Sequence, residues 1–198
     1  MRARSVPCGI SRRIVGRIAG FTLLEIMVAV LVLALGIVGG VAMHMAALRA
    51  RHQSAMLAQA SWLAAGMAER MRANPDQMRL PDGANPYLTL DDDALAAPAV
   101  PAPAALCYGG ACDAARLALF DLYEMKTLMR QHLPAGRALV CRDAALWSGG
   151  RLRWSCSGGA SAPLVVKVGW RGKNPDGTPQ RDEDGEFAPG VALIVGVL

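Results

Sequence analysis

Hydrophobic residues dominate the stretch from Phe21 to Leu48. Within this run Glu25 is the only formally charged residue, and His44 is the only other ionisable group. The apolar residues fall on every side of a helix, as is typical of a helix buried in lipid or in a bundle. At about 1.5 Å of rise per residue, the run makes a helix of roughly 40 Å, which is enough to cross a bilayer with some tilt. The pattern therefore predicts a membrane-spanning helix with one carboxylate near its start.

After Leu48 the hydrophobic residues recur at three- and four-residue steps, which is the spacing of one buried helix face. The predicted buried stripe consists of Leu57, Ala60, Ala64, Met67 and Met71. Pro75 disfavours a helical conformation in the residue before it, so the helix should end near Asn74. We therefore expect one continuous helix from residue 21 to about residue 74, with residues 21–48 in the membrane.

Proline, alanine and aspartate dominate residues 75 to about 104, which we interpret as a loop region. The run Asp91-Asp92-Asp93 is expected to form a solvated turn or the start of a helix. Alternating proline and alanine from residue 97 to residue 104 predict an extended, polyproline-like spacer.

The remaining residues, 105–198, are predicted to form a globular head with a short helix and a sheet. The helix begins after Asp113, a suitable N-cap residue, and ends at His132. Its expected inner face consists of Leu122, Met125, Met129 and Leu133. Four strands are predicted beyond it, at Arg137–Cys141, Leu152–Cys156, Leu164–Trp170 and Val191–Leu198. A helix followed by a run of strands favours an α+β fold, in which an antiparallel sheet packs against the long N-terminal helix.

Positive charge is concentrated before the apolar run. The 198 residues carry 21 Lys and Arg against 16 Asp and Glu, a formal net charge of +5. Five arginines and no acids precede Phe21, so the rest of the chain has 16 basic and 16 acidic residues. A basic flank of this kind stays on the cytoplasmic side, which places the C-terminal head outside. The head has no evident basic patch, so a nucleic acid is not an expected partner.

Between the basic flank and the apolar run lies Gly20-Phe21-Thr22-Leu23-Leu24-Glu25, which resembles the N-terminus of type IV prepilins. In that family a membrane-embedded prepilin peptidase cleaves after the glycine and N-methylates the phenylalanine. The glutamate then meets the N-terminal amine of a neighbouring subunit in the filament. The resemblance implies a leader at residues 1–20, a processing junction at Gly20 and Phe21, and an assembly carboxylate at Glu25.

Three further segments look like those of PilV-type minor pilins: Met67–Asn74, the segment from Cys112 to Gly136, and the strand from Val165 to Trp170. This resemblance implies a type IV pilin-like fold and a role in priming or modifying pilus assembly, in support of twitching motility. The implied partners are the prepilin peptidase, other minor pilins and the major pilin. The protein would start as a single-pass inner-membrane precursor and end in the pilus at the cell surface. A minor pseudopilin of a type II secretion system has the same N-terminal start and is the alternative.

Glycines inside the apolar helix have two interpretations. Gly36 and Gly40 form a GxxxG pair, which favours close packing of helices. Each glycine also lowers helix propensity by about 1 kcal/mol relative to alanine, so the same region would serve as a weak point where a pilin helix unwinds. The sequence does not choose between them.

Cleavage of the leader would remove Cys8 and leave four cysteines: Cys107, Cys112, Cys141 and Cys156. An even number outside the cytoplasm favours disulfides, and four cysteines allow three connectivities. A two-residue turn at Ser148-Gly149 would set Cys141 opposite Cys156, within disulfide range. Cys107 and Cys112 flank a short flexible loop that can close on itself. A four-cysteine zinc site is the rival interpretation.

Other chemistry is poorly represented in the sequence. The acidic loop at residues 176–186 fails the EF-hand pattern, because Gln180 and Val191 occupy positions that need carboxylates. A looser calcium site and a solvated hairpin loop both stay open there. The three histidines are not accompanied by a nucleophile elbow, a phosphate-binding loop or a zinc-binding pair. We therefore expect neither enzymatic activity nor a cofactor, and a signal-anchored enzyme and a membrane-tethered binding module are the weaker hypotheses.

Overall fold

The structure, a computed structural model, describes residues 20–96, 99–104, 106–173, 177–179, 181 and 185–196. The chain divides into two units between His44 and Met45. Helix α1 (Leu23–Ala73) is continuous through both units, so the long helix predicted from the sequence is confirmed. The predicted leader lies outside the described residues, except for Gly20.

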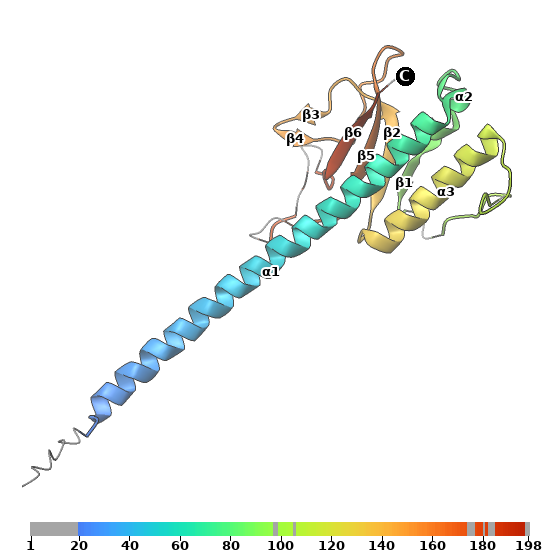
Figure 1. Ribbon diagram of the computed structural model, residues 1–198. Helices are drawn as coiled ribbons and strands as arrows, with labels where there is room; N and C mark the ends of the chain where they lie inside the picture. Colours follow the sequence, from blue (N-terminus) through green and yellow to red (C-terminus); the bar gives the residue numbers. More distant parts are fainter. Residues whose placement is uncertain are drawn as a thin grey trace, which may run out of the picture. The chain divides into compact units, whose positions relative to one another are not determined.

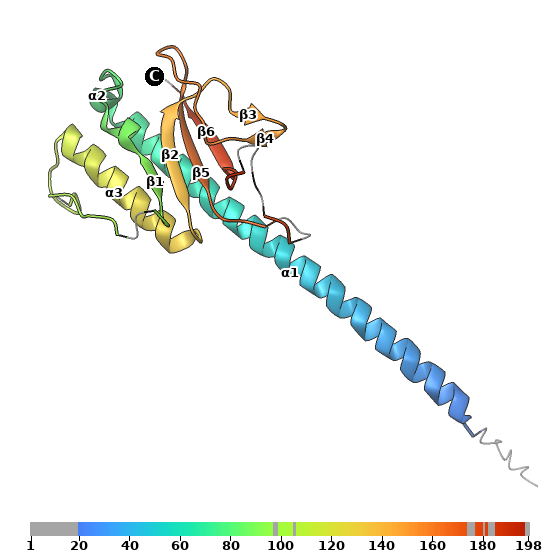
Figure 2. The ribbon, with the colours of Figure 1, turned by 180° about the vertical axis from the view of Figure 1, so that it is seen from behind.

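The second unit contains the end of α1 and all the other described elements (Figures 1 and 2). In chain order they are α2 (Pro75–Met78), the 3-10 helix η1 (Pro86–Thr89), β1 (Asp91–Asp93), α3 (Ala114–His132), β2 (Arg137–Arg142), β3 (Trp147–Ser148), β4 (Arg151–Leu152), β5 (Leu164–Gly169) and β6 (Val191–Val195). Strands β1, β2, β5 and β6 form an antiparallel sheet in the order β1-β2-β5-β6, and β3 and β4 form a separate hairpin. The predicted α+β fold is confirmed.

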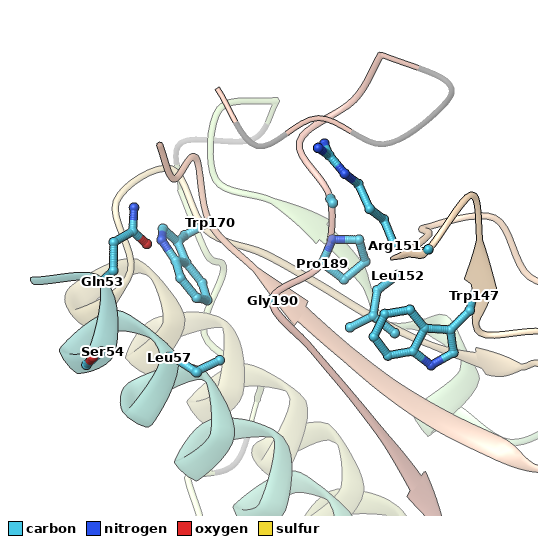
Figure 3. A pocket seen from close by; sticks show the side chains of 11 residues that line it. Gln53, Ser54, Leu57, Trp147, Arg151, Leu152, Trp170, Pro189 and Gly190 are labelled. Carbon is cyan, nitrogen blue, oxygen red and sulfur yellow. The ribbon is translucent and has the colours of Figure 1, made fainter. Parts of the chain in front are cut away.

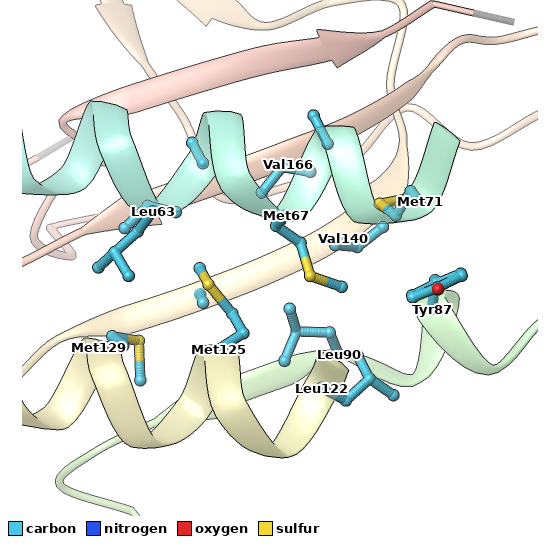
Figure 4. Close-up of a cluster of buried hydrophobic side chains, with 14 of the residues drawn as sticks. Leu63, Met67, Met71, Tyr87, Leu90, Leu122, Met125, Met129, Val140 and Val166 are labelled. Carbon is cyan, nitrogen blue, oxygen red and sulfur yellow. The ribbon is translucent and has the colours of Figure 1, made fainter. Parts of the chain in front are cut away.

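Both long helices pack on the same face of the sheet, and their facing side chains make the core (Figure 4). Met67 and Met71 of α1 pack in one buried cluster with Leu122, Met125 and Met129 of α3 and with Val140 and Val166 of the sheet. The inner face predicted for α3 is confirmed, and the Asp113 side chain caps this helix by accepting a hydrogen bond from the Arg116 amide at 2.8 Å. The predicted stripe of α1 is right except at Leu57, which is 47% exposed. Leu57 lines a groove instead of the core.

The acidic run at Asp91–Asp93 is a strand, and the expectation of a solvated turn or helix start was wrong. It forms the edge strand β1, which pairs with β2 in the register Asp92↔Ala138. The Asp92 side chain is buried because its carboxylate accepts a hydrogen bond from the Arg130 guanidinium of α3 at 2.7 Å. A charge can be buried in this way only when it is paired. The stretch at residues 75–104 is therefore not a simple loop, since it also contains α2 and η1.

The hairpin after β2 also differs from the prediction. Gly149 and Gly150, with φ angles of 55° and 77°, form the turn, and the register is Trp147↔Leu152. Two successive residues with positive φ favour glycine at both positions, and this moves the turn one residue along from the expected Ser148-Gly149. Of the predicted strand Leu152–Cys156, only Leu152 lies in a strand, at the end of β4 (Arg151–Leu152). The last two strands start as predicted, but end at Gly169 and Val195.

The segment between β2 and β5 is held by a buried ion pair on the face of the sheet away from α1. Lys167 of β5 is fully buried, and its Nζ donates to the Asp143 carboxylate at 2.6 Å. Nζ also donates to the carbonyls of Arg153 and Ser155, both at 2.9 Å. Burial lowers the pKa of Lys167. Burial alone would raise the pKa of Asp143, but hydrogen bonds from Lys167 and two backbone amides outweigh it and lower that pKa.

We expect Lys167→Met to destabilise this unit by about 3–5 kcal/mol, because it leaves the Asp143 charge buried without its partner. Chemical denaturation of the full chain in detergent measures the effect. Lys126→Met, at a half-buried lysine on α3, is the matched control and should change stability by less than about 1 kcal/mol. The double variant Asp143→Leu with Lys167→Met should recover part of the loss, and equal stability of Lys167→Met and wild type would contradict this role.

Candidate functional site

The predicted processing junction lies directly before α1. Gly20 and Phe21 precede the first helical residue, Leu23, and the Phe21 side chain is 77% exposed. A Cβ placed on Gly20 would meet no atom within 4 Å. Nothing in the described chain therefore covers this peptide bond, and the glycine is not required by packing within the chain.

Thr22 and Glu25 build the first turn of α1. The Thr22 hydroxyl accepts a hydrogen bond from the Glu25 amide at 3.2 Å, as an N-cap residue does. The Thr22 carbonyl accepts from the Ile26 amide at 3.3 Å. The Glu25 carboxylate is exposed, and no described residue forms an ion pair or hydrogen bond with its side chain. Within the described part of the chain, the favourable neighbour of this carboxylate is the positive end of the helix dipole.

Residues 20–51 expose a large apolar surface. All described residues from Gly20 to Arg51 are exposed, including the large hydrophobic residues Phe21, Leu23, Leu24, Ile26, Met27, Val28, Val30, Leu31, Val32, Leu33, Leu35, Ile37, Val38, Val41, Met43, Met45 and Leu48. Helix α1 is long and apolar enough to cross a membrane. A Cβ placed on Gly36 or Gly40 would meet no atom within 4 Å, so nothing in the described chain packs closely on this pair.

The four cysteines of the head form two disulfides, Cys107–Cys112 and Cys141–Cys156. This is the expected connectivity, and it leaves none of the four as a zinc ligand. The reason given for the second pair was wrong, because Cys141 lies opposite Val165 in the sheet and not opposite a strand that contains Cys156. The two Cα atoms still lie 6.4 Å apart, within disulfide range, and the Gly158 amide donates to the Arg142 carbonyl at 3.0 Å, which holds the chain after β4 beside the end of β2.

We expect the two disulfides to contribute unequally to stability. The cysteines are separated by 15 residues in Cys141–Cys156 and by 5 residues in Cys107–Cys112. Loop-closure entropy gives about 3 and about 2 kcal/mol for loops of these sizes, respectively. Paired Cys→Ser variants, compared by chemical denaturation, should therefore lose more stability at Cys141 and Cys156. A larger loss at Cys107 and Cys112 would contradict this ranking.

A groove that the sequence did not predict lies between α1 and the β3–β4 hairpin (Figure 3). Its volume is about 430 Å³, and Leu57 and Trp170 face Trp147 and Leu152 across it. Trp147 is 64% exposed, whereas the Trp170 ring packs on Gly190. A Cβ at Gly190 would collide with that ring. Gly190 is the sequence feature that reflects the packing of the Trp170 ring.

A buried polar network, also unpredicted, fixes the end of α1 to α3. The Tyr87 hydroxyl donates to the Asp121 carboxylate at 2.9 Å and accepts from the Asn74 amide at 3.1 Å. Arg70 forms ion pairs with both Asp121 and Glu124. Burial raises the pKa of Asp121 and also that of Tyr87. These residues hold the last turns of α1, and their role is structural.

The remaining candidates do not form a common site. His44 and His52 lie on α1, and His132 at the end of α3 packs edge-on against Trp62 at 6.5 Å between ring centroids. Of the five acidic residues in the loop at residues 176–186, the candidate calcium site, only Glu186 lies within the described residues. Within the described residues, no group of three His, Cys, Asp or Glu side chains is arranged to hold a metal ion.

Two family models match adjacent parts of the chain. Residues 16–41 match the prokaryotic N-terminal methylation motif, and residues 42–123 match a family described as type IV pilin Tt1218. No curated protein and no solved structure gives a significant match. The first match contains Gly20, Phe21 and Glu25, and the second runs from the apolar helix into α3.

Proposed function

The chain is a type IV pilin protein with an N-terminal methylation motif, and from this premise we propose that it is a minor pilin of PilV type that helps to prime or modify pilus assembly. Its partners would be the prepilin peptidase, other minor pilins and the major pilin. Before assembly it would cross the inner membrane once, with the head in the periplasm. After assembly it would lie in the pilus at the cell surface.

The observation that carries this proposal is the part of α1 in the first unit. It has an uncovered apolar surface and one carboxylate, that of Glu25, without a partner in the described chain. Burial of apolar surface is the main favourable contribution to protein association, so this surface needs lipid or other helices around it. An unpaired carboxylate in hydrocarbon costs several kcal/mol, which a positive group on a neighbour would offset. The N-terminal amine that cleavage would create at Phe21 of a neighbouring subunit is such a group.

The head supports a minor role. Residues 75–104 build α2, η1 and the edge strand β1, and the two disulfides constrain the loops around α3 and β2. A priming subunit must differ from the major subunit in its head, so that it starts a filament without forming its body. The unusual composition of residues 75–104 and the four cysteines fit this requirement.

A minor pseudopilin of a type II secretion system is the second candidate, because its N-terminus has the same Gly-Phe-Thr-Leu-x-Glu start. Deletion of the gene separates the two. We expect a loss of surface pili and twitching, by at least about tenfold in pilus number, while proteins continue to be secreted. Complementation with the wild-type gene should restore the pili. Intact pili with secreted proteins trapped in the periplasm would assign the protein to the secretion system.

A further inference from the structure

A second cavity, of about 590 Å³, lies beside α1 just after the apolar run ends. Met45, Leu48, Arg49 and His52 line it from α1, and Pro134, Trp170, Arg171 and Lys173 line it from the head. A hydrogen bond from the Gln53 amide to the Lys173 carbonyl ties the two sides together. Gln53 and Trp170 lie beside each other at this point (Figure 3). The lining of the cavity thus contains both apolar and basic side chains.

The lining of the cavity brings together cations that are far apart in the sequence. Arg49, Arg171 and Lys173 line the cavity, and the side chain of His52 adds a further nitrogen donor. The Arg171 guanidinium carbon lies 5.3 Å from the centroid of the Phe187 ring, in a cation–π contact. None of the ion pairs among the described residues involves these cations. The acids at positions 176 and 182–184 lie outside the described residues, so binding must be measured with the full chain.

The position of the cavity along α1 indicates which layer of a lipid bilayer it would face. From Leu23 to Arg49 the helix rises about 39 Å, whereas the hydrocarbon core is about 30 Å thick and the bilayer with its headgroups about 40–45 Å. If the helix starts at one surface, Met45 to Arg49 therefore lie in the headgroup layer of the other. Lysine, arginine and tryptophan are the residues that favour this layer.

We propose that this cavity binds an anionic phospholipid of the leaflet next to the head, with the phosphate between the cations and the acyl chains beside Met45 and Leu48. The inference rests on the membrane-inserted state of the proposed function, before the subunit enters a filament. A guanidinium group matches a phosphate with paired N–H donors, and a lysine adds a point charge. Bound lipid would anchor the head at the surface of the membrane until assembly replaces the lipid contacts.

The test is a titration of the full-length chain in detergent with phosphatidylglycerol, followed by native mass spectrometry. Phosphatidylcholine is the zwitterionic control, and inorganic phosphate is the control for a free anion. Each cation near a headgroup contributes about fivefold in affinity, so Arg49→Gln with Lys173→Gln should weaken phosphatidylglycerol binding about 25-fold. Arg51→Gln with Lys126→Gln removes the same charge outside the cavity and should change it less than about twofold.

Equal binding of phosphatidylcholine and phosphatidylglycerol would overturn the proposal, and so would unchanged binding by the cavity variant. Displacement of the lipid by inorganic phosphate would assign the cavity to a free anion and would also overturn it. Thermal unfolding of each variant serves as a check that the head is intact. Lipid binding is measured without filaments, so its failure leaves the minor-pilin proposal standing, and absence of the protein from filaments leaves lipid binding standing.

Discussion

Gly20→Val is expected to leave the protein as an uncleaved, unmethylated precursor in the membrane. A peptidase that accepts only a small residue before the cut has no room for the branched side chain. The chain itself does have room, because a Cβ at Gly20 meets no atom within 4 Å. Failure of cleavage would therefore report on recognition by the peptidase and not on misfolding. Intact-mass measurement of the membrane fraction distinguishes the precursor from the form that begins at Phe21.

Gly83→Val is the matched control for this experiment. Gly83 also has open space around the position of a Cβ, and it lies far along the chain in the loop between α2 and η1. This variant should be cleaved as the wild type is. A mature form with N-methylated Phe21 from Gly20→Val would refute the assigned junction.

Glu25→Ala is expected to reduce the amount of this protein in filaments at least tenfold, while membrane insertion and cleavage continue. The carboxylate has no side-chain partner in the described chain, so within a filament its charge must be offset by another subunit. Loss of about 1.4 kcal/mol from the subunit contact already gives a tenfold effect. The Thr22 cap bonds to the backbone amide of residue 25, so alanine leaves the start of the helix in place. Quantitative immunoblots of sheared filaments and of membranes give the two amounts.

Glu69→Ala is the control on the same helix, since Glu69 is exposed in the head and its ion pair among the described residues is with Arg72. Surface pairs of this kind contribute little, so its amount in filaments should stay within about twofold of wild type. Normal recovery of Glu25→Ala from filaments would show that the charge pair is unnecessary in this protein.

Both long helices could be predicted from the sequence because their signals are local. Helix α1 follows from an apolar run and an amphipathic stripe that ends before Pro75, and α3 follows from the Asp113 cap and the spacing of its buried residues. Four of the strands start where residue periodicity placed them, or within one residue. The exposure of Leu57 was missed, because the spacing of a stripe does not show where the covering sheet ends.

Two features that the sequence did not reveal depend on long-range contacts, and one error is local. Asp92 is buried in a strand only because Arg130, which lies beyond the loop and on another helix, supplies its counter-charge. Lys167 interrupts an apolar strand, and only the fold reveals that Asp143 crosses over it. The hairpin register was off because two consecutive glycines allowed two turn positions, and the structure uses the one with positive φ at both.

The functional residues likewise include some that the sequence could reveal and others that only the fold brings together. Gly20, Phe21 and Glu25 lie within one short motif, so the sequence alone could single them out, and the methylation-motif match covers all three. The cavity beside Arg49 could not be predicted, because Arg171 and Lys173 reach it from the end of β5. Charges so far apart in the sequence show no cluster until the sheet and α1 bring them together.

The most direct test of the minor-pilin account is mass spectrometry of filaments sheared from the cell surface and purified. The account predicts a low-abundance form of this chain that begins with N-methylated Phe21 and carries the Cys107–Cys112 and Cys141–Cys156 disulfides, together with a more abundant major pilin. Recovery of the chain only from the membrane, with residues 1–20 still attached, would contradict it.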